Sequence, residues 1–230
     1  MSEVGEKHYS LKELNLLFPD PAGQIRLQWA FAPNHAARVL LVEQAIDHIA
    51  QTLTRTRHLR QHKSEDLLTV DFVDRLVDMG FSASHDNDVG GHCDIVIDGR
   101  EGFLWLGEAK IHSSYKWLYK GFQQLTTRYS SGLPGQDVGG LLIYLYNRNA
   151  LEMMKAWREH LATERSDIKI EQCEANPLVF RSSHTHEVSG LPYTVRHVPV
   201  PLYFAPDDKI RSKTVAEKSV PPGTSSSSID

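Results

Sequence analysis

Two acidic residues and one lysine stand close together in an otherwise apolar part of the chain. Asp94 lies within Gly91-His-Cys-Asp-Ile-Val-Ile-Asp98, while Glu108 and Lys110 end the stretch Phe103-Leu-Trp-Leu-Gly-Glu-Ala-Lys110. Charged groups on a buried strand destabilise the fold unless they have partners. Mg²⁺ is a suitable partner, because it prefers oxygen ligands and keeps several water molecules. Carboxylates, a divalent cation and a neighbouring ammonium group together suit phosphodiester hydrolysis.

A β-hairpin would bring these three side chains together. The segment Asp98-Gly-Arg-Glu-Gly102 is rich in turn-forming residues and separates two apolar runs, which predicts a turn between two strands. Residues two apart on a strand project from the same face, so Glu108 and Lys110 are expected side by side. The hairpin then places Asp94 roughly opposite Gly107 and Glu108. The strands expected here are 81–85, 93–98 and 103–112.

This pattern resembles the signature of a known nuclease superfamily. Asp94, thirteen intervening residues and then Glu108-Ala109-Lys110 on the next strand resemble the D…(D/E)XK motif of the PD-(D/E)XK nucleases. The resemblance covers about residues 64–147. It departs from the motif at residue 93, which is cysteine where the motif has proline. It implies an α/β, restriction-endonuclease-like sandwich in which helices flank a mixed central sheet, with an αβββαβ core. It also implies a metal-dependent endonuclease.

The resemblance extends to residues on the two helices beside this hairpin. Families of this superfamily usually carry an acidic residue on the preceding helix, and Glu65 matches that position. A helical wheel groups Glu65 with apolar positions that include Leu68 and Phe72. The resemblance implies that Asp94, Glu108 and Glu65 hold Mg²⁺, for which Mn²⁺ can substitute, and that Lys110 activates the nucleophile. On the following helix it implies a catalytic role for Gln124, with Gln123 as the alternative.

Two acid-free stretches carry basic residues. From Ala109 to Gln136 there is no acidic residue, and basic and aromatic side chains alternate there. We interpret this stretch as a DNA-facing surface, although a solvated helix face is the commoner fate of such charges. Its candidate nucleic-acid-binding residues are Tyr115, Lys116, Lys120 and Arg128. A second stretch, between Gln51 and Ser64, also lacks acids and contains Arg55, Arg57, Arg60 and Lys63.

The remaining patterns divide the chain into three parts. Residues 1–35 form a lead-in interrupted by prolines. Residues 36–205 form the nuclease-like domain, and residues 206–230, rich in Ser, Pro and Lys, are expected to be a disordered tail. Within the domain, helices are expected at 36–61, 64–79, 115–130 and 149–163, with a buried strand at 140–146. Strands at 168–173, 178–181 and 193–204 are expected to extend one edge of the sheet.

Composition limits the remaining possibilities. A net charge of −4 excludes binding to nucleic acid through bulk charge, so local patches are required. Two cysteines are too few for a disulfide framework and favour a reducing, cytoplasmic setting. No apolar run is long enough to cross a membrane, so a soluble protein is expected. The spacing of Cys173, His184, His186 and His197 fits no strong zinc template.

The sequence therefore favours a Mg²⁺-dependent DNA endonuclease, without choosing between restriction, repair and phage defence. RNA remains a compatible substrate. A different class of function is a nuclease-like fold without catalysis, which serves as a nucleic-acid-binding or assembly subunit. Double-strand cleavage by a core with one site favours a homodimer, or a complex with a partner protein.

Overall fold

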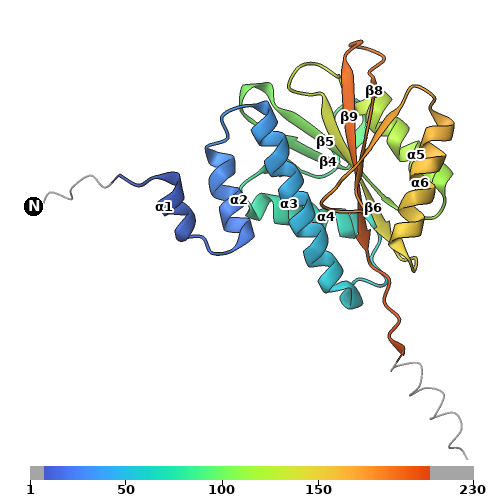
Figure 1. The fold of residues 1–230 in the computed structure, drawn as a ribbon, viewed down its shortest axis with the longest axis horizontal. Coiled ribbons are helices and arrows are strands. Elements are labelled where there is room, and N and C mark those ends of the chain that lie inside the picture. Colours follow the sequence, from blue (N-terminus) through green and yellow to red (C-terminus); the bar gives the residue numbers. More distant parts are fainter. Residues whose placement is uncertain (1–7, 208–230) are drawn as a thin grey trace, which may run out of the picture.

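The chain forms a mixed seven-stranded β-sheet between two layers of helices (Figure 1). The structure is a computed structural model that describes residues 8–207. The expected tail at 206–230 falls almost entirely outside these residues. An α/β architecture with helices on both faces of a mixed sheet agrees with the fold class expected from the sequence.

The central strands are parallel and the outer strands are antiparallel. Across the sheet the order is β1-β4-β5-β6-β9-β8-β7, and the pairs β5–β6 and β6–β9 are parallel. The apolar runs of β5 and β6 are buried, as is typical of parallel strands covered on both faces. The bounds are β1 Ser82–Ser84, β4 Ile95–Asp98, β5 Leu104–Ile111, β6 Val138–Leu145, β7 Lys169–Gln172, β8 Phe180–Thr185 and β9 Pro192–Pro201. Two further strands, β2 Asn87–Asp88 and β3 His92–Cys93, pair separately.

One face of the sheet is covered by the helices α3 His35–Arg55 and α4 Glu65–Asp78. The Ser64 hydroxyl caps α4 by accepting a hydrogen bond from the amide of Leu67. The helix ends before Gly80, whose positive φ of 85° suits glycine. Both helices begin within one residue of their predicted starts. The predicted helix over 36–61 ends at Arg55, and a short 3₁₀ turn, η1 Arg57–Leu59, follows.

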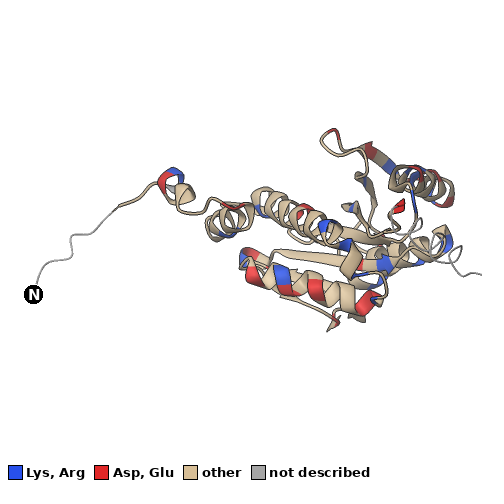
Figure 2. Ribbon diagram, turned by 90° about the horizontal axis from the view of Figure 1, so that it is seen from below, with Lys and Arg blue, Asp and Glu red and all other residues tan. Residues whose placement is uncertain are grey.

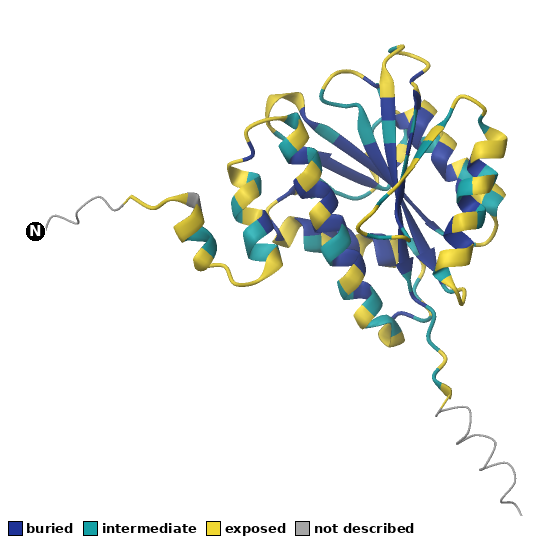
Figure 3. Ribbon diagram, viewed as in Figure 1, coloured by how far each residue is buried: buried dark blue, intermediate teal, exposed yellow. Residues whose placement is uncertain are grey.

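The expected lead-in at residues 1–35 contains two helices, α1 Leu11–Leu16 and α2 Pro21–Ala30. Helix α2 packs beside α3, and its Trp29 ring lies 4.6 Å from the ring of Phe81. Helix α1 projects away from the body of the fold, with Leu16 79% exposed (Figures 1 and 3). Within the described residues of the lead-in, 8–35, it is therefore the second part that packs against the domain.

The other face of the sheet is covered by α5 Tyr115–Gln123 and α6 Ala150–Glu164. The predicted helix over 115–130 is helical almost throughout, but its last turn, η3 Gln124–Tyr129, is a π-helix. In that turn the amide of Ser130 donates to the carbonyl of Leu125, five residues earlier. Buried residues line the inner faces of both helix layers (Figure 3).

The last three strands extend the sheet beyond β6, as expected, but not all of them lie at its edge. Strand β9 runs parallel to β6 and lies between β6 and β8, so β7 alone is the edge strand on that side. His197 of β9 is fully buried, where Trp157 Nε1 donates to its Nδ1. None of the helices that the structure describes is long and apolar enough to cross a membrane.

Candidate active site

Strand β5 carries Glu108 and Lys110 on the face that α5 covers, as their two-residue spacing predicts. The side chains fit beneath the helix because residue 121 of α5 is glycine. A Cβ atom at Gly121 would lie 3.0 Å from Lys110 Cγ and 3.3 Å from Glu108 Cγ. The missing side chain therefore provides the space that the two charged groups occupy.

Asp94 reaches the same place from the strand next to β5. It immediately precedes β4, in which Ile95 pairs with Gly107, so Asp94 lies opposite Glu108 as the hairpin predicted. Its Oδ2 atom accepts a hydrogen bond of 2.8 Å from the amide of Ala109. The same oxygen lies 3.6 Å from Lys110 Nζ.

Glu65 enters from the opposite layer of helices, around the end of β5. It is the first residue of α4, directly after the Ser64 cap. Its Oε2 atom accepts a 2.6 Å hydrogen bond from the amide of Ile111, and its Oε1 atom lies 3.3 Å from Lys110 Nζ. The inward position expected from the helical wheel is confirmed, because Leu68, Phe72 and Leu76 on the same side of α4 are fully buried.

The ammonium group of Lys110 lies among all three carboxylates. Its shortest contact is 2.6 Å to Glu108 Oε1, and only 6% of the residue is exposed. Burial alone lowers the pKa of this ammonium, but the charges of Glu108, Asp94 and Glu65 outweigh it and raise the pKa. Lys110 is therefore held in its charged form.

Glu108 is the most buried of the three acids, with 1% of the residue exposed. Burial, followed by the neighbouring charge of Asp94, raises its pKa to about 7. Its Oε2 atom is buried and has no hydrogen-bond partner. A buried carboxylate oxygen without a partner is costly and is a feature of sites that hold an additional group.

Asp94 and Glu108 have the donor chemistry that Mg²⁺ requires, because both offer carboxylate oxygens and Asp94 keeps 26% of its side chain exposed. Among the described residues, however, no group of three or more His, Cys, Asp or Glu side chains is arranged to hold a metal ion. The Lys110 ammonium occupies the space among the three carboxylates. The donor types thus fit a divalent cation, provided that the flexible stem of Lys110 moves.

The π-helical turn after α5 lies beside the acids. Gln124 Nε2 donates to the hydroxyl of Tyr129 over 3.3 Å. Burial raises the pKa of Tyr129, and the charges of Glu108 and Asp94 add to the effect. The turn packs tightly against the loop that precedes Asp94, because a Cβ atom at Gly90 would lie 2.2 Å from the carbonyl oxygen of residue 128. Gln124, the expected catalytic residue, is thus held by Tyr129 near the site.

The expected nucleic-acid-binding residues fall into two groups. Lys116, Lys120 and Arg128 are exposed. Lys120 lies 5.2 Å from the centre of the Trp117 ring, and the same ring lies 5.5 Å from Lys110 Nζ. Tyr115 instead makes ring contacts with His112 and with His160 of α6.

Sequence reasoning did not single out Trp117, Gly121 and Tyr129, which the structure places around the site. Trp117, Gly121 and Gln124 follow the helical spacing i, i+4 and i+7, so a wheel centred on Gln124 identifies the first two. Tyr129 is five residues after Gln124, and only the wider π-helical turn brings the two side chains together.

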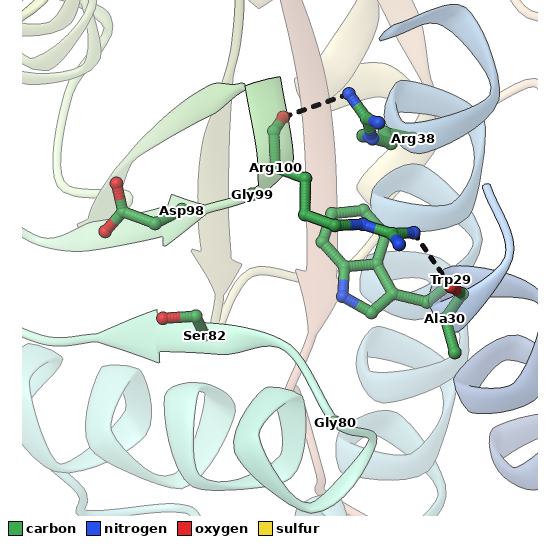
Figure 4. Close-up of a pocket in the computed structure, with 8 residues that line it drawn as sticks. All are labelled: Trp29, Ala30, Arg38, Gly80, Ser82, Asp98, Gly99 and Arg100. Atoms are coloured by element: carbon green, nitrogen blue, oxygen red, sulfur yellow. Dashed lines mark hydrogen bonds between the residues drawn. The ribbon is translucent and has the colours of Figure 1, made fainter. Parts of the chain in front are cut away.

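A separate pocket of about 490 Å³ lies at the far end of β4, away from Asp94 (Figure 4). Its lining includes Trp29, Ser82 and Asp98. Two arginines beside it are engaged with the main chain, because Arg38 donates to the carbonyl of Arg100 and Arg100 donates to that of Ala30. None of the expected catalytic residues lines this pocket.

Comparison of the chain with models of protein families, with curated proteins and with solved structures finds no match.

Proposed function

We propose that this protein is a metal-dependent nuclease that hydrolyses phosphodiester bonds of DNA, with a restriction-endonuclease-like core. The observation that carries the proposal is the convergence of Asp94, Glu108 and Glu65 on the ammonium group of Lys110. Four charged groups, from β5, the residue before β4 and the start of α4, meet in a largely buried place, an arrangement that is costly unless it serves a function.

In this proposal Asp94 and Glu108 hold a divalent cation, and the buried Oε2 atom of Glu108 is available for it. When bound, Mg²⁺ or Mn²⁺ lowers the pKa of a bound water molecule and neutralises charge on a phosphoryl oxygen. Glu65 is anchored to the amide of Ile111 and assists either directly or through water. Its anchoring fixes the approach of α4 to the end of β5.

Lys110 acts as an electrostatic group in this proposal. Surrounded by carboxylates it remains an ammonium, so it can position the attacking water and stabilise charge on the transition state rather than remove a proton. The nearby face of Trp117 offers the ammonium a favourable contact outside the carboxylate cluster. Gln124, braced by Tyr129, is positioned to orient the scissile strand.

One observation favours a second candidate, a nucleic-acid-binding or assembly subunit without catalysis. Lys110 neutralises the acids by itself, and the described residues contain no ready-made metal cluster. A purely structural ion-pair cluster would look the same in the absence of a cation.

Cleavage assays distinguish the two candidates. The purified chain is incubated with plasmid and linear DNA, and in parallel with RNA, in Mg²⁺ or Mn²⁺. The nuclease proposal expects cation-dependent DNA cleavage that is lost in Asp94→Asn and Lys110→Ala and retained in Asp98→Asn, a control at the other end of β4. Equal cleavage by all variants, or none by the wild type, would remove the proposal. Cleavage of RNA alone would reassign the substrate.

A further inference from the structure

A second group of basic residues lies beside the site, at the end of the sheet where β5, β6 and β9 finish. Arg55 is the last residue of α3, Arg57 and Lys63 lie between α3 and α4, and Arg148 follows β6. We call Arg55, Arg57, Lys63 and Arg148, together with Tyr203, the basic surface. Figure 2 views the molecule from the side at which α3 ends and marks its Lys and Arg positions in blue.

Within the basic surface, one arginine lies against an aromatic ring and another bonds to the main chain of the same residue. Arg148 Nε donates to the hydroxyl of Tyr203 over 2.6 Å, and its guanidinium lies 5.2 Å from the centre of that ring. Arg57 Nε donates to the carbonyl of Tyr203 over 3.1 Å. Cations interleaved with aromatic rings are the combination that nucleic-acid-binding surfaces use.

The nearby acidic residues neutralise only part of the positive charge of the basic surface. Asp71 takes part in ion pairs with Arg60 and Arg75, both at 2.9 Å, and with Lys63 at 3.6 Å. The hydrogen bond to Tyr203 raises the pKa of Arg148, and the charge of Asp207 adds to the effect. Arg55 and Arg148 remain exposed, and no acidic residue occurs between Gln51 and Ser64.

A continuous series of contacts joins the basic surface to the candidate active site. Glu65 bonds to the amide of Ile111, and the next residue, His112, bonds through its Nδ1 to Asn147 Oδ1 over 3.0 Å. Asn147 precedes Arg148, which contacts Tyr203. Lys63 of the basic surface also lies close to the site in sequence, two residues before Glu65. The basic surface therefore borders the candidate active site at the end of β5.

We propose that the basic surface binds the phosphate backbone of the DNA substrate beside the bond to be cleaved. This inference rests on the proposed nuclease function. With a net charge of −4 the protein as a whole does not attract DNA, so affinity has to come from local clusters of this kind. The basic surface and the exposed lysines of α5 then contact the DNA on different sides of the candidate active site.

DNA binding without cleavage tests the inference. Anisotropy of a labelled duplex of about 30 base pairs is measured in EDTA over a series of salt concentrations. Arg55→Gln combined with Arg148→Gln is compared with Lys12→Gln combined with Lys169→Gln, which removes the same charge from exposed positions on α1 and β7. We expect the first variant to bind about tenfold more weakly at low salt, with a salt slope smaller by about two, because each lost phosphate contact lowers the slope by roughly 0.9. The control variant should bind like the wild type.

Cleavage of the long duplex in Mn²⁺ separates the two proposals. The Arg55 and Arg148 variant should cleave it more slowly than the wild type at DNA concentrations below saturation, because it binds the phosphate backbone more weakly. If the wild type cleaves DNA but the variant and its control bind the long duplex with equal affinity and equal salt slope, the inference is wrong and the nuclease proposal stands. If the wild type neither binds nor cleaves DNA, both are wrong.

Discussion

Glu65 is bonded to the main chain of the strand that carries the candidate catalytic lysine, because its Oε2 atom accepts a 2.6 Å hydrogen bond from the amide of Ile111. Its other oxygen faces Lys110 Nζ. One carboxylate thus links the start of α4 to the end of β5, and the same group belongs to the candidate site. Stability and activity should therefore respond together when this residue is changed.

Glu65→Ala should lower the free energy of unfolding by about 1–3 kcal/mol, because it leaves a half-buried amide without its acceptor. Glu65→Gln keeps an acceptor oxygen and should cost less stability, while still reducing DNA cleavage because it removes a negative charge beside Lys110. Urea unfolding and cleavage rates measure the two effects. Asp66→Ala, an exposed acid in the same turn, is the control. An equal loss of stability in both alanine variants would contradict the anchoring role.

Lys110→Met should abolish cleavage and destabilise the fold by about 3 kcal/mol, because three carboxylates lose their shared counter-charge. Thermal unfolding and cleavage assays measure these losses. Lys120→Met is a matched control, since Lys120 lies over the same Trp117 ring but is exposed. A Lys110→Met protein as stable as the Lys120→Met protein would show that the ion pairs of Lys110 contribute little to the stability of the fold.

Gly121→Ala should reduce cleavage about tenfold while leaving folding largely intact. The added methyl group must displace the side chains of Lys110 and Glu108 by a few tenths of an ångström, and small misplacements of catalytic groups are costly. Alanine is favoured over glycine in a helix by up to about 1 kcal/mol, which offsets part of the crowding. Steady-state kinetics and thermal unfolding of Gly121→Ala are compared with Glu159→Ala, an exposed substitution on α6 in the same layer of helices. Unchanged kinetics would show that the close approach of α5 to Lys110 and Glu108 is unimportant for cleavage.

Acidification should destabilise the fold through His197. Burial lowers the pKa of this histidine to about 3, whereas in the unfolded chain it is near 6.5. Between these values the unfolded state binds the proton and the folded state does not. The free energy of unfolding therefore falls by up to about 1.4 kcal/mol for each pH unit as the pH drops from 6.5.

His197→Gln cannot be protonated and should flatten this dependence, although it loses some stability at neutral pH because Trp157 and Ser182 bond to the imidazole. Urea unfolding between pH 4 and pH 7 measures the slope. His62→Gln, at an exposed position, should retain the wild-type slope. If both variants follow the same curve, His197 does not control acid stability.

Much of the fold could be predicted because local signals agree with the tertiary structure. Ser64 marks the start of α4 and Gly80 its end, and the turn residues at 98–102 lie between β4 and β5. Residue spacing was also sufficient to place Glu108 and Lys110 on one face. These features depend on capping, turns and strand alternation, which neighbouring residues determine.

Features that depend on distant contacts could not be predicted in the same way. The π-helical turn at 124–129 packs against the loop at Gly90 and Gly91, which is remote in sequence. The position of β9 between β6 and β8 follows from long-range pairing. The sequence also indicated that a cation joins the acids, but it could not show that the ammonium of Lys110 lies among all three.

The central claim is that Asp94 and Glu108 together bind a divalent cation. Calorimetric titration of Mn²⁺ into the purified chain tests it, with Asp94→Asn, Glu108→Gln and the control Asp98→Asn measured alongside. We expect one Mn²⁺ site in the wild type and in Asp98→Asn that is absent from both other variants. No binding to the wild type, or equal binding to all four proteins, would contradict it.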